Sequence, residues 1–127
     1  MNYQVILNTD QSINLSDVQN LDISSFTKTL NDRNISFINF SGAIVNKGLI
    51  SLIQPDNVED GEKKVQIQLN NGQALIVGVD DDFNATEIVN LLNERINQFI
   101  SIGKLIITKN LIGTIVPVNE VDPSHEE

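Results

Sequence analysis

Four cationic residues recur at one spacing and are the side chains best suited to bind an anion. Arg33 and Arg95 are 62 residues apart, and so are Lys47 and Lys109. Guanidinium and ammonium groups bind carboxylates and phosphates through charge-assisted hydrogen bonds, so the two pairs together would form a pocket for a small anionic ligand. A second interpretation needs no ligand. Each Arg ends an expected helix, where a cation complements the helix dipole, and each Lys lies in a turn before a strand.

A run of three carboxylates, Asp80-Asp81-Asp82, offers the oxygen ligands that calcium and magnesium prefer. The run lacks the alternating spacing and the distal Glu of a calcium-binding loop. The residues 62 positions earlier are Val18-Gln19-Asn20, and the run precedes an expected helix start, where negative charge is favourable. We therefore expect a solvated loop and no metal site.

Other catalytic groups have no recognisable setting in this sequence. The single histidine, His125, lies in an acidic C-terminal segment with no expected neighbour to position it as a general base. The chain contains no cysteine, which excludes a thiolate nucleophile, a disulfide and a zinc site of the Cys type. No glycine-rich phosphate-binding motif occurs. We expect a protein that is not an enzyme and needs no cofactor.

The spacing of 62 extends over most of the chain without an insertion or deletion. Leu30-Asn31-Asp32-Arg33 aligns with Leu92-Asn93-Glu94-Arg95, and Phe37-Ile38 aligns with Phe99-Ile100. Further identical pairs are Ile44 with Ile106, Leu49-Ile50 with Leu111-Ile112, Ile53 with Ile115, and Pro55 with Pro117. A single offset held across the whole alignment predicts a tandem duplication.

Each copy predicts the element order ββαβββ. In the second copy Val65–Leu69 alternates apolar and polar residues, Asn70-Asn71-Gly72 forms a tight turn, and Ala74–Val77 returns as a strand. Asn84, and Asp22 in the first copy, are expected to cap the start of a helix. Three short strands in a meander are expected to follow, at 37–40, 43–45 and 49–53 in the first copy and at 99–102, 105–107 and 111–116 in the second.

Two local features of the repeats lead to separate expectations. The first copy has Thr9-Asp10 where the second has Asn71-Gly72, so less permissive residues must make its turn. Leu105-Ile106-Ile107 and Leu111-Ile112 are apolar enough for burial on both faces. Such strands need a second layer, which either the other repeat or another chain must provide.

The repeats divide the chain into residues 1–55, an acidic linker at 56–64, residues 65–117 and an acidic tail at 118–127. A unit of about 60 residues buries only roughly 60% of its unfolded surface and is marginal alone, so the copies should pack on each other. Pseudo-two-fold packing is the simplest solution. The predicted fold class is α+β, with antiparallel sheets that each carry one packed helix.

The net charge of the chain limits the classes of partner that it can bind. The 127 residues include 17 acidic and 8 basic side chains, for a net charge of -9. Counterion release requires several cations on one face, so we expect no direct binding to nucleic acid, although the acidic surface is compatible with mimicry of it. No apolar run approaches the roughly 20 residues that span a bilayer, and the first residues do not resemble a signal peptide. We expect a cytoplasmic location, or a virion if the role is structural.

In the second copy, Asn71-Gly72-Gln73 precedes a short helix and the pattern Phe99-Ile100-x-Ile102-Gly103-x-x-Ile106-Ile107-x-Lys109-x-x-Ile112-x-x-Ile115-x-Pro117. This arrangement resembles small uncharacterised phage and prophage proteins of low-GC Gram-positive bacteria. The resemblance covers one copy and, more loosely, the other. Its residues are mostly core and turn positions, so it implies origin and fold and carries no activity.

Three hypotheses for function follow from these patterns. The leading one is a phage-type accessory protein that binds a host or phage protein through a sheet edge or a helix face. The second is a small-ligand protein with a pocket between the repeats near Arg33, Arg95, Lys47 and Lys109. The third is a minor structural component of a virion, and a homo-oligomer is compatible with each of the three.

Overall fold

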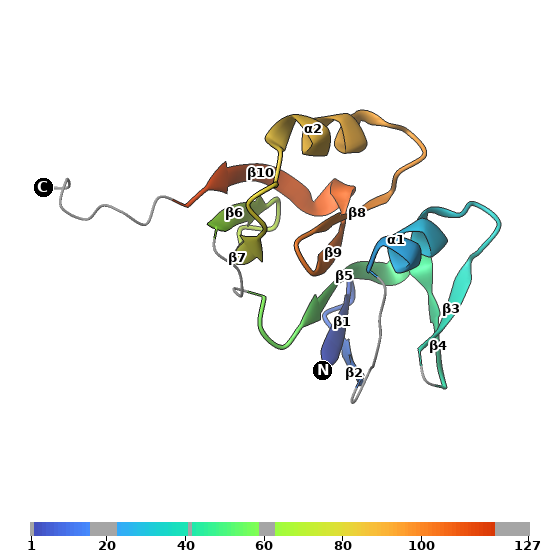
Figure 1. Ribbon diagram of the computed structural model, residues 1–127. Helices are drawn as coiled ribbons and strands as arrows, with labels where there is room; N and C mark the ends of the chain where they lie inside the picture. The colour runs from blue at the N-terminus through green and yellow to red at the C-terminus, as the bar shows by residue number, and fades with distance from the viewer. Residues whose placement is uncertain (1, 16–22, 41, 59–62, 119–127) are drawn as a thin grey trace, which may run out of the picture.

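The computed structural model describes residues 2–15, 23–40, 42–58 and 63–118, which form ten strands and two α-helices (Figure 1). The N-terminal half contains β1 (Tyr3–Leu7), β2 (Ser12–Leu15), α1 (Ile23–Asn31), β3 (Phe37–Phe40), β4 (Ala43–Asn46), the 3-10 turn η1 (Lys47–Leu49) and β5 (Ile50–Pro55). The C-terminal half contains β6 (Lys63–Leu69), β7 (Ala74–Val79), α2 (Ala85–Asn93), β8 (Phe99–Ile102), β9 (Leu105–Thr108), η2 (Lys109–Leu111) and β10 (Ile112–Pro117). From α1 onward, the bounds of each element recur 62 residues later. We call residues 62 positions apart equivalent.

All described strand pairs are antiparallel, and they form three sheets. The largest has the order β2-β1-β5-β9-β8, the second β10-β6-β7, and β3 pairs with β4 alone. The α+β class with antiparallel sheets is therefore confirmed. The largest sheet contains strands from both halves, so the halves are joined by backbone hydrogen bonds as well as by side chains.

The predicted three-stranded meanders are wrong. β5 pairs with β1 and not with β4, and β10 pairs with β6 and not with β9. The cause is the 3-10 turn that follows each hairpin. The Asn8 amide donates to the Leu49 carbonyl at 2.7 Å, and the Asn70 amide donates to the Leu111 carbonyl at 2.9 Å. These bonds attach each turn to the first hairpin of its own half and direct the last strand along it.

The predicted pseudo-two-fold axis is not confirmed, because the halves join in one direction only. β5 pairs with β9, with Leu52 opposite Ile107 and Ile53 opposite Ile106. A two-fold axis would require β10 to pair with β4 in the same way. Among the described residues, β10 pairs with β6 alone and β4 pairs with β3 alone.

Two buried clusters lie on the two faces of the five-stranded sheet. One contains Val5, Ile53 and Ile106 with residues of α1 and of the β3–β4 hairpin, and the other contains Leu52 and Ile107 with residues of the three-stranded sheet. Leu105, Ile106 and Ile107 are fully buried, as their apolar run predicts, whereas Leu111 and Ile112 are only half-buried, so that part of the expectation is wrong. The layer that covers the second face of β9 comes from the N-terminal half of the same chain, which is one of the two sources that the sequence predicts.

No helix among the described residues is long and apolar enough to cross a membrane; α1 and α2 have nine residues each.

The turn between β1 and β2 confirms the expectation of a less permissive sequence. Asp10 has a φ of 72°, whereas Gly72 occupies the equivalent position with a φ of 96°. Residues with a Cβ atom are disfavoured in this left-handed region, and aspartate tolerates it better than most. The first turn therefore contains mild backbone strain that the second turn avoids.

We expect Asp10→Gly to raise the free energy of unfolding by about 0.5–1 kcal/mol, because glycine removes this strain. Urea titration followed by circular dichroism measures the change. The control is Thr9→Gly at the neighbouring turn position, which has no positive φ to relieve and should be destabilising. Equal effects of the two changes would contradict the explanation.

Burial raises the pKa of the Tyr3 phenol above its ordinary value of 10.0. The folded state therefore favours the neutral phenol. This contribution to stability is complete below pH 10 and is lost as the pH rises through the folded-state pKa. Tyr3 is the single tyrosine and there is no tryptophan, so the absorbance of tyrosinate reports this group alone. We expect a higher titration midpoint in the folded protein than in urea; coincident midpoints would contradict the prediction.

Candidate functional site: an apolar groove beside α2

The structure places the two recurring lysines at the ends of their own helices. The Lys47 ammonium donates to the Asp32 carbonyl at 2.6 Å, and the Lys109 ammonium donates to the Glu94 carbonyl at 2.9 Å and the Leu92 carbonyl at 3.2 Å. The Asp32 and Glu94 carbonyls follow the helices and also accept the amides of Ile35 and Asn97. The Leu92 carbonyl lies in the last turn of α2, so each ammonium group adds a hydrogen bond at a helix end. Lys47 and Lys109 lie in the turns η1 and η2 before β5 and β10, as predicted, and their side chains bind the helix ends, where the sequence predicts that the arginines act.

Arg33 and Arg95 are exposed, and no described residue makes a hydrogen bond or ion pair with either side chain. None of the four predicted ligand-binding residues lines the groove described below. The anionic-ligand pocket stays a prediction, because these four residues do not line the cavity that the structure describes.

Asp80, Asp81 and Asp82 are exposed in the turn that precedes α2. The described residues contain no group of three potential metal ligands. The Asn84 side chain accepts hydrogen bonds from the amides of Thr86 and Glu87, at 2.8 and 3.3 Å, which confirms its predicted capping role. Asp22 and His125 lie outside the described residues.

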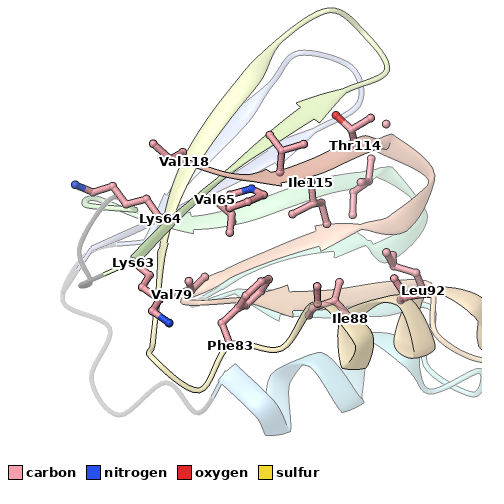
Figure 2. A pocket seen from close by; sticks show the side chains of 16 residues that line it. Lys63, Lys64, Val65, Val79, Phe83, Ile88, Leu92, Thr114, Ile115 and Val118 are labelled. Carbon is pink, nitrogen blue, oxygen red and sulfur yellow. The ribbon is translucent and has the colours of Figure 1, made fainter. Parts of the chain in front are cut away.

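An apolar groove of about 570 Å³ separates α2 from β10 (Figure 2). Helix residues Ile88, Val89 and Leu92 line one side, and β10 lines the other. Lys63 and Lys64 lie at the end near Val118, and Leu92 lies at the opposite end (Figure 2). Among the residues that the structure describes, no acidic side chain lines the groove.

The local sequence explains the shape of this groove. Ile88 and Leu92 are four residues apart, so they lie on one face of α2 and point to the same side. Val89 and Asn93 form a second i, i+4 row beside them. On the opposite side, β10 pairs with β6 along one edge, and no described strand pairs with the other edge.

The equivalent groove in the N-terminal half is filled. There the β8–β9 hairpin lies against α1 and β5, and Figure 1 shows the two hairpin strands beside these elements. Phe99 and Ile106 share a buried cluster with Leu30, Ile50 and Ile53. The residues equivalent to these last three are Leu92, Ile112 and Ile115, and they are only half-buried. One chain thus contains the same groove once filled and once open.

Asn31 fixes the hairpin in the filled groove. Its side-chain oxygen accepts from the amides of Gln98 and Phe99, both at 2.8 Å, and its amide nitrogen donates to the Phe99 carbonyl at 3.0 Å. It also donates to the Asn97 side chain at 3.3 Å. The equivalent Asn93 is exposed and makes no side-chain hydrogen bond with a described residue.

The β3–β4 hairpin exposes side chains whose equivalents in the β8–β9 hairpin are buried. Phe37 is 60% exposed and Ile44 is 74% exposed, whereas the equivalent Phe99 and Ile106 are 3% and 0% exposed. The sequence aligns Phe37 with Phe99 and Ile44 with Ile106 in equivalent expected strands and does not distinguish the two pairs. The recurrence of Asn31 and Asn93, which is visible in the sequence, was the signal for the site, but it could not show which of the two is paired.

No protein-family model, curated protein or solved structure matches this chain. The resemblance to phage and prophage proteins therefore stays a prediction.

We expect Asn31→Ala to lower the free energy of unfolding by about 1–3 kcal/mol, because it leaves the buried start of β8 without its partners. The matched control is Asn93→Ala, which removes the same side chain from the unfilled groove and should change stability by less than about 0.5 kcal/mol. Urea denaturation in dilute solution measures both. Similar losses would show that the amide acts within its own helix and not on the hairpin.

Proposed function

We propose that this chain is a protein-binding module that captures a β-hairpin in the groove between α2 and β10. The observation that carries the proposal is the filled counterpart of the groove, where β8 and β9 lie against α1 and β5. A β-hairpin is thus a ligand that the same arrangement of helix, strand and asparagine already accommodates. The proposal is of the same kind as the leading hypothesis from the sequence, a non-enzymatic interaction module.

Strand addition supplies the affinity in this mechanism. An edge strand presents unpaired amides and carbonyls that another strand can satisfy. β10 has such an edge, and the half-buried Leu92, Ile112 and Ile115 beside it offer apolar surface that a ligand would cover. Burial of apolar area contributes about 25 cal/mol per Å², and alternate side chains of the added strand provide the specificity.

The groove favours this ligand over a small anion. Its walls are mainly apolar, and its two cations lie together at one end. A carboxylate or phosphate bound along the apolar part would lose its hydration without a paired donor, which is costly. An apolar hairpin side chain meets no such penalty.

We also infer that the chain arose by tandem duplication. The inference is supported by identical residues at one offset and by element bounds that recur at that offset from α1 to β10. A duplication explains why one chain holds two similar grooves and two similar hairpins. A phage-type origin and a virion role remain compatible with such a module and stay proposals.

A synthetic hairpin tests the proposed function. The probe is the sequence of residues 98–109 closed by a disulfide between cysteines added at both ends, which is feasible because the chain itself has no cysteine. We expect saturable binding by calorimetry and amide chemical-shift changes confined to α2 and β10. A control peptide with Phe99→Asp and Ile106→Asp should bind at least about tenfold more weakly, because it places charge in an apolar groove.

A variant of the protein locates the binding. Val89 is exposed on α2 and lines the groove. Val89→Glu should therefore leave the fold intact and weaken binding of the hairpin peptide by a similar factor. Absence of saturable binding, or equal binding by the control peptide, would overturn the proposed function.

A further inference from the structure

We propose that the ligand of this groove is the β3–β4 hairpin of a second copy of the chain, so that copies associate head to tail. The inference rests on the proposed function and names its partner. In the internal junction, the β8–β9 hairpin fills the groove of α1 and β5. The chain leaves two equivalent surfaces open, namely the groove between α2 and β10 and one face of the β3–β4 hairpin.

The open hairpin carries the residues that make the internal junction. Phe37 and Ile44 are identical in type to Phe99 and Ile106, which fill the internal groove. The register places Phe37, Asn39 and Ile44 on one face of the β3–β4 hairpin, with Asn39 opposite Ile44. Residues of the opposite face pack into the chain's own core, as Ile38, Phe40 and Val45 do. The exposed face is therefore held in position by a buried one.

The open groove, together with Asn93 beside it on α2, contains the matching residues. Leu92, Asn93, Ile112 and Ile115 are identical in type to Leu30, Asn31, Ile50 and Ile53, which receive the internal hairpin. All six residues of the internal contact named here thus have an identical counterpart on a surface that is partly or fully exposed. The chain displays both partners of a junction that it has already formed once.

The strand edges are complementary as well. In the internal junction Leu52 lies opposite Ile107 and Ile53 lies opposite Ile106. The equivalent register pairs Thr114 with Val45 and Ile115 with Ile44 of the second copy. Among the described residues, neither β10 nor β4 has a neighbour on the edge that this pairing needs.

Asn93 supplies the orienting hydrogen bonds. Asn31 binds the amides of Gln98 and Phe99 and the carbonyl of Phe99. The equivalent backbone groups belong to Ser36 and Phe37, so Asn93 meets the same three partners in a second copy. The side-chain bond to Asn97 is not transferred, because the equivalent residue is Ile35. The transferred contacts are to backbone groups, which every residue type provides.

The charge distribution permits contact between two acidic chains. The chain carries a net charge of -9, yet residues 36–47 contain no acidic side chain and one lysine. The described part of the groove lining also contains no acidic residue. The contact surfaces therefore avoid like-charge opposition, and the remaining repulsion between chains is long-range and screened by salt. We expect association to strengthen when the salt concentration is raised.

This contact joins two different surfaces and leaves one of each free on every dimer. Such heterologous contacts form closed rings where the rotation between copies closes and filaments where it does not. Light scattering coupled to gel filtration measures the outcome on the full chain. We expect masses above that of one chain that increase with protein concentration or settle at a fixed multiple.

Two variants block opposite surfaces without touching the buried core. Ile44→Lys places a charge on the exposed hairpin face, and Val89→Glu combined with Asn93→Ala alters exposed positions of α2, one in the groove and one beside it. Each should weaken self-association at least about tenfold. Ile76→Lys is the matched control, because Ile76 is also an exposed isoleucine on a sheet edge but lies outside the groove and the hairpin. Its association should equal that of the unmodified chain.

Mixing the two blocked variants tests the head-to-tail arrangement. The hairpin variant keeps an intact groove and the groove variant keeps an intact hairpin, so an equimolar mixture should form a complex of two chains and nothing larger. A monomeric unmodified chain at all concentrations, or a mixture that remains monomeric, would overturn the proposal. Association that neither variant weakens would also overturn it.

The hairpin peptide separates failure of this inference from failure of the proposed function. Binding of the peptide by the Ile44→Lys variant, together with an unmodified chain that stays monomeric, keeps the groove as a binding site and rejects a second copy as its ligand. Absence of both peptide binding and self-association rejects both proposals.

Discussion

The pairing of β5 with β9 is the interaction on which the rest of the structure depends. It inserts a hairpin of the C-terminal half into a sheet of the N-terminal half, so Ile106 enters one buried cluster and Ile107 enters the other. Without this pairing, each half would be a unit of about 60 residues with an open sheet edge and an uncovered apolar face, which is marginal in water. The same pairing places the start of β8 at the end of α1, where Asn31 can bind it.

Because the two similar halves join in one direction only, one groove and one hairpin of the chain remain uncovered. A two-fold contact would cover both grooves and both hairpins, but the observed contact covers one of each. Ile53 and Ile115 show the result, because they are equivalent and identical in type, yet the first is fully buried and the second is half-buried. The open groove is thus a consequence of the one-way topology.

The sequence predicts the local structure well because local structure depends on local pattern. The alternation in 65–69, the asparagine cap at Asn84 and the strained turn at Asp10 each depend on a few adjacent residues, and each is confirmed. The failures concern which strand edges meet. Periodicity shows which side of a strand is apolar, but β5 has the same pattern whether it pairs with β4 or with β1 and β9. For the same reason, Ile44 and Ile106 could not be told apart before their neighbours were known.

At one pair of equivalent positions the residue types follow the surroundings, apolar where the pair is covered and polar where it is exposed. Ile6 and Leu52 form a cross-strand pair that packs against the second buried cluster. The equivalent pair, Gln68 and Thr114, is exposed and polar. Phe37 and Ile44 are exposed too, yet they keep the residue types that fill the internal groove. Because large exposed side chains gain stability only when a contact covers them, the face that keeps them is better explained by a partner than by the folding of a single chain.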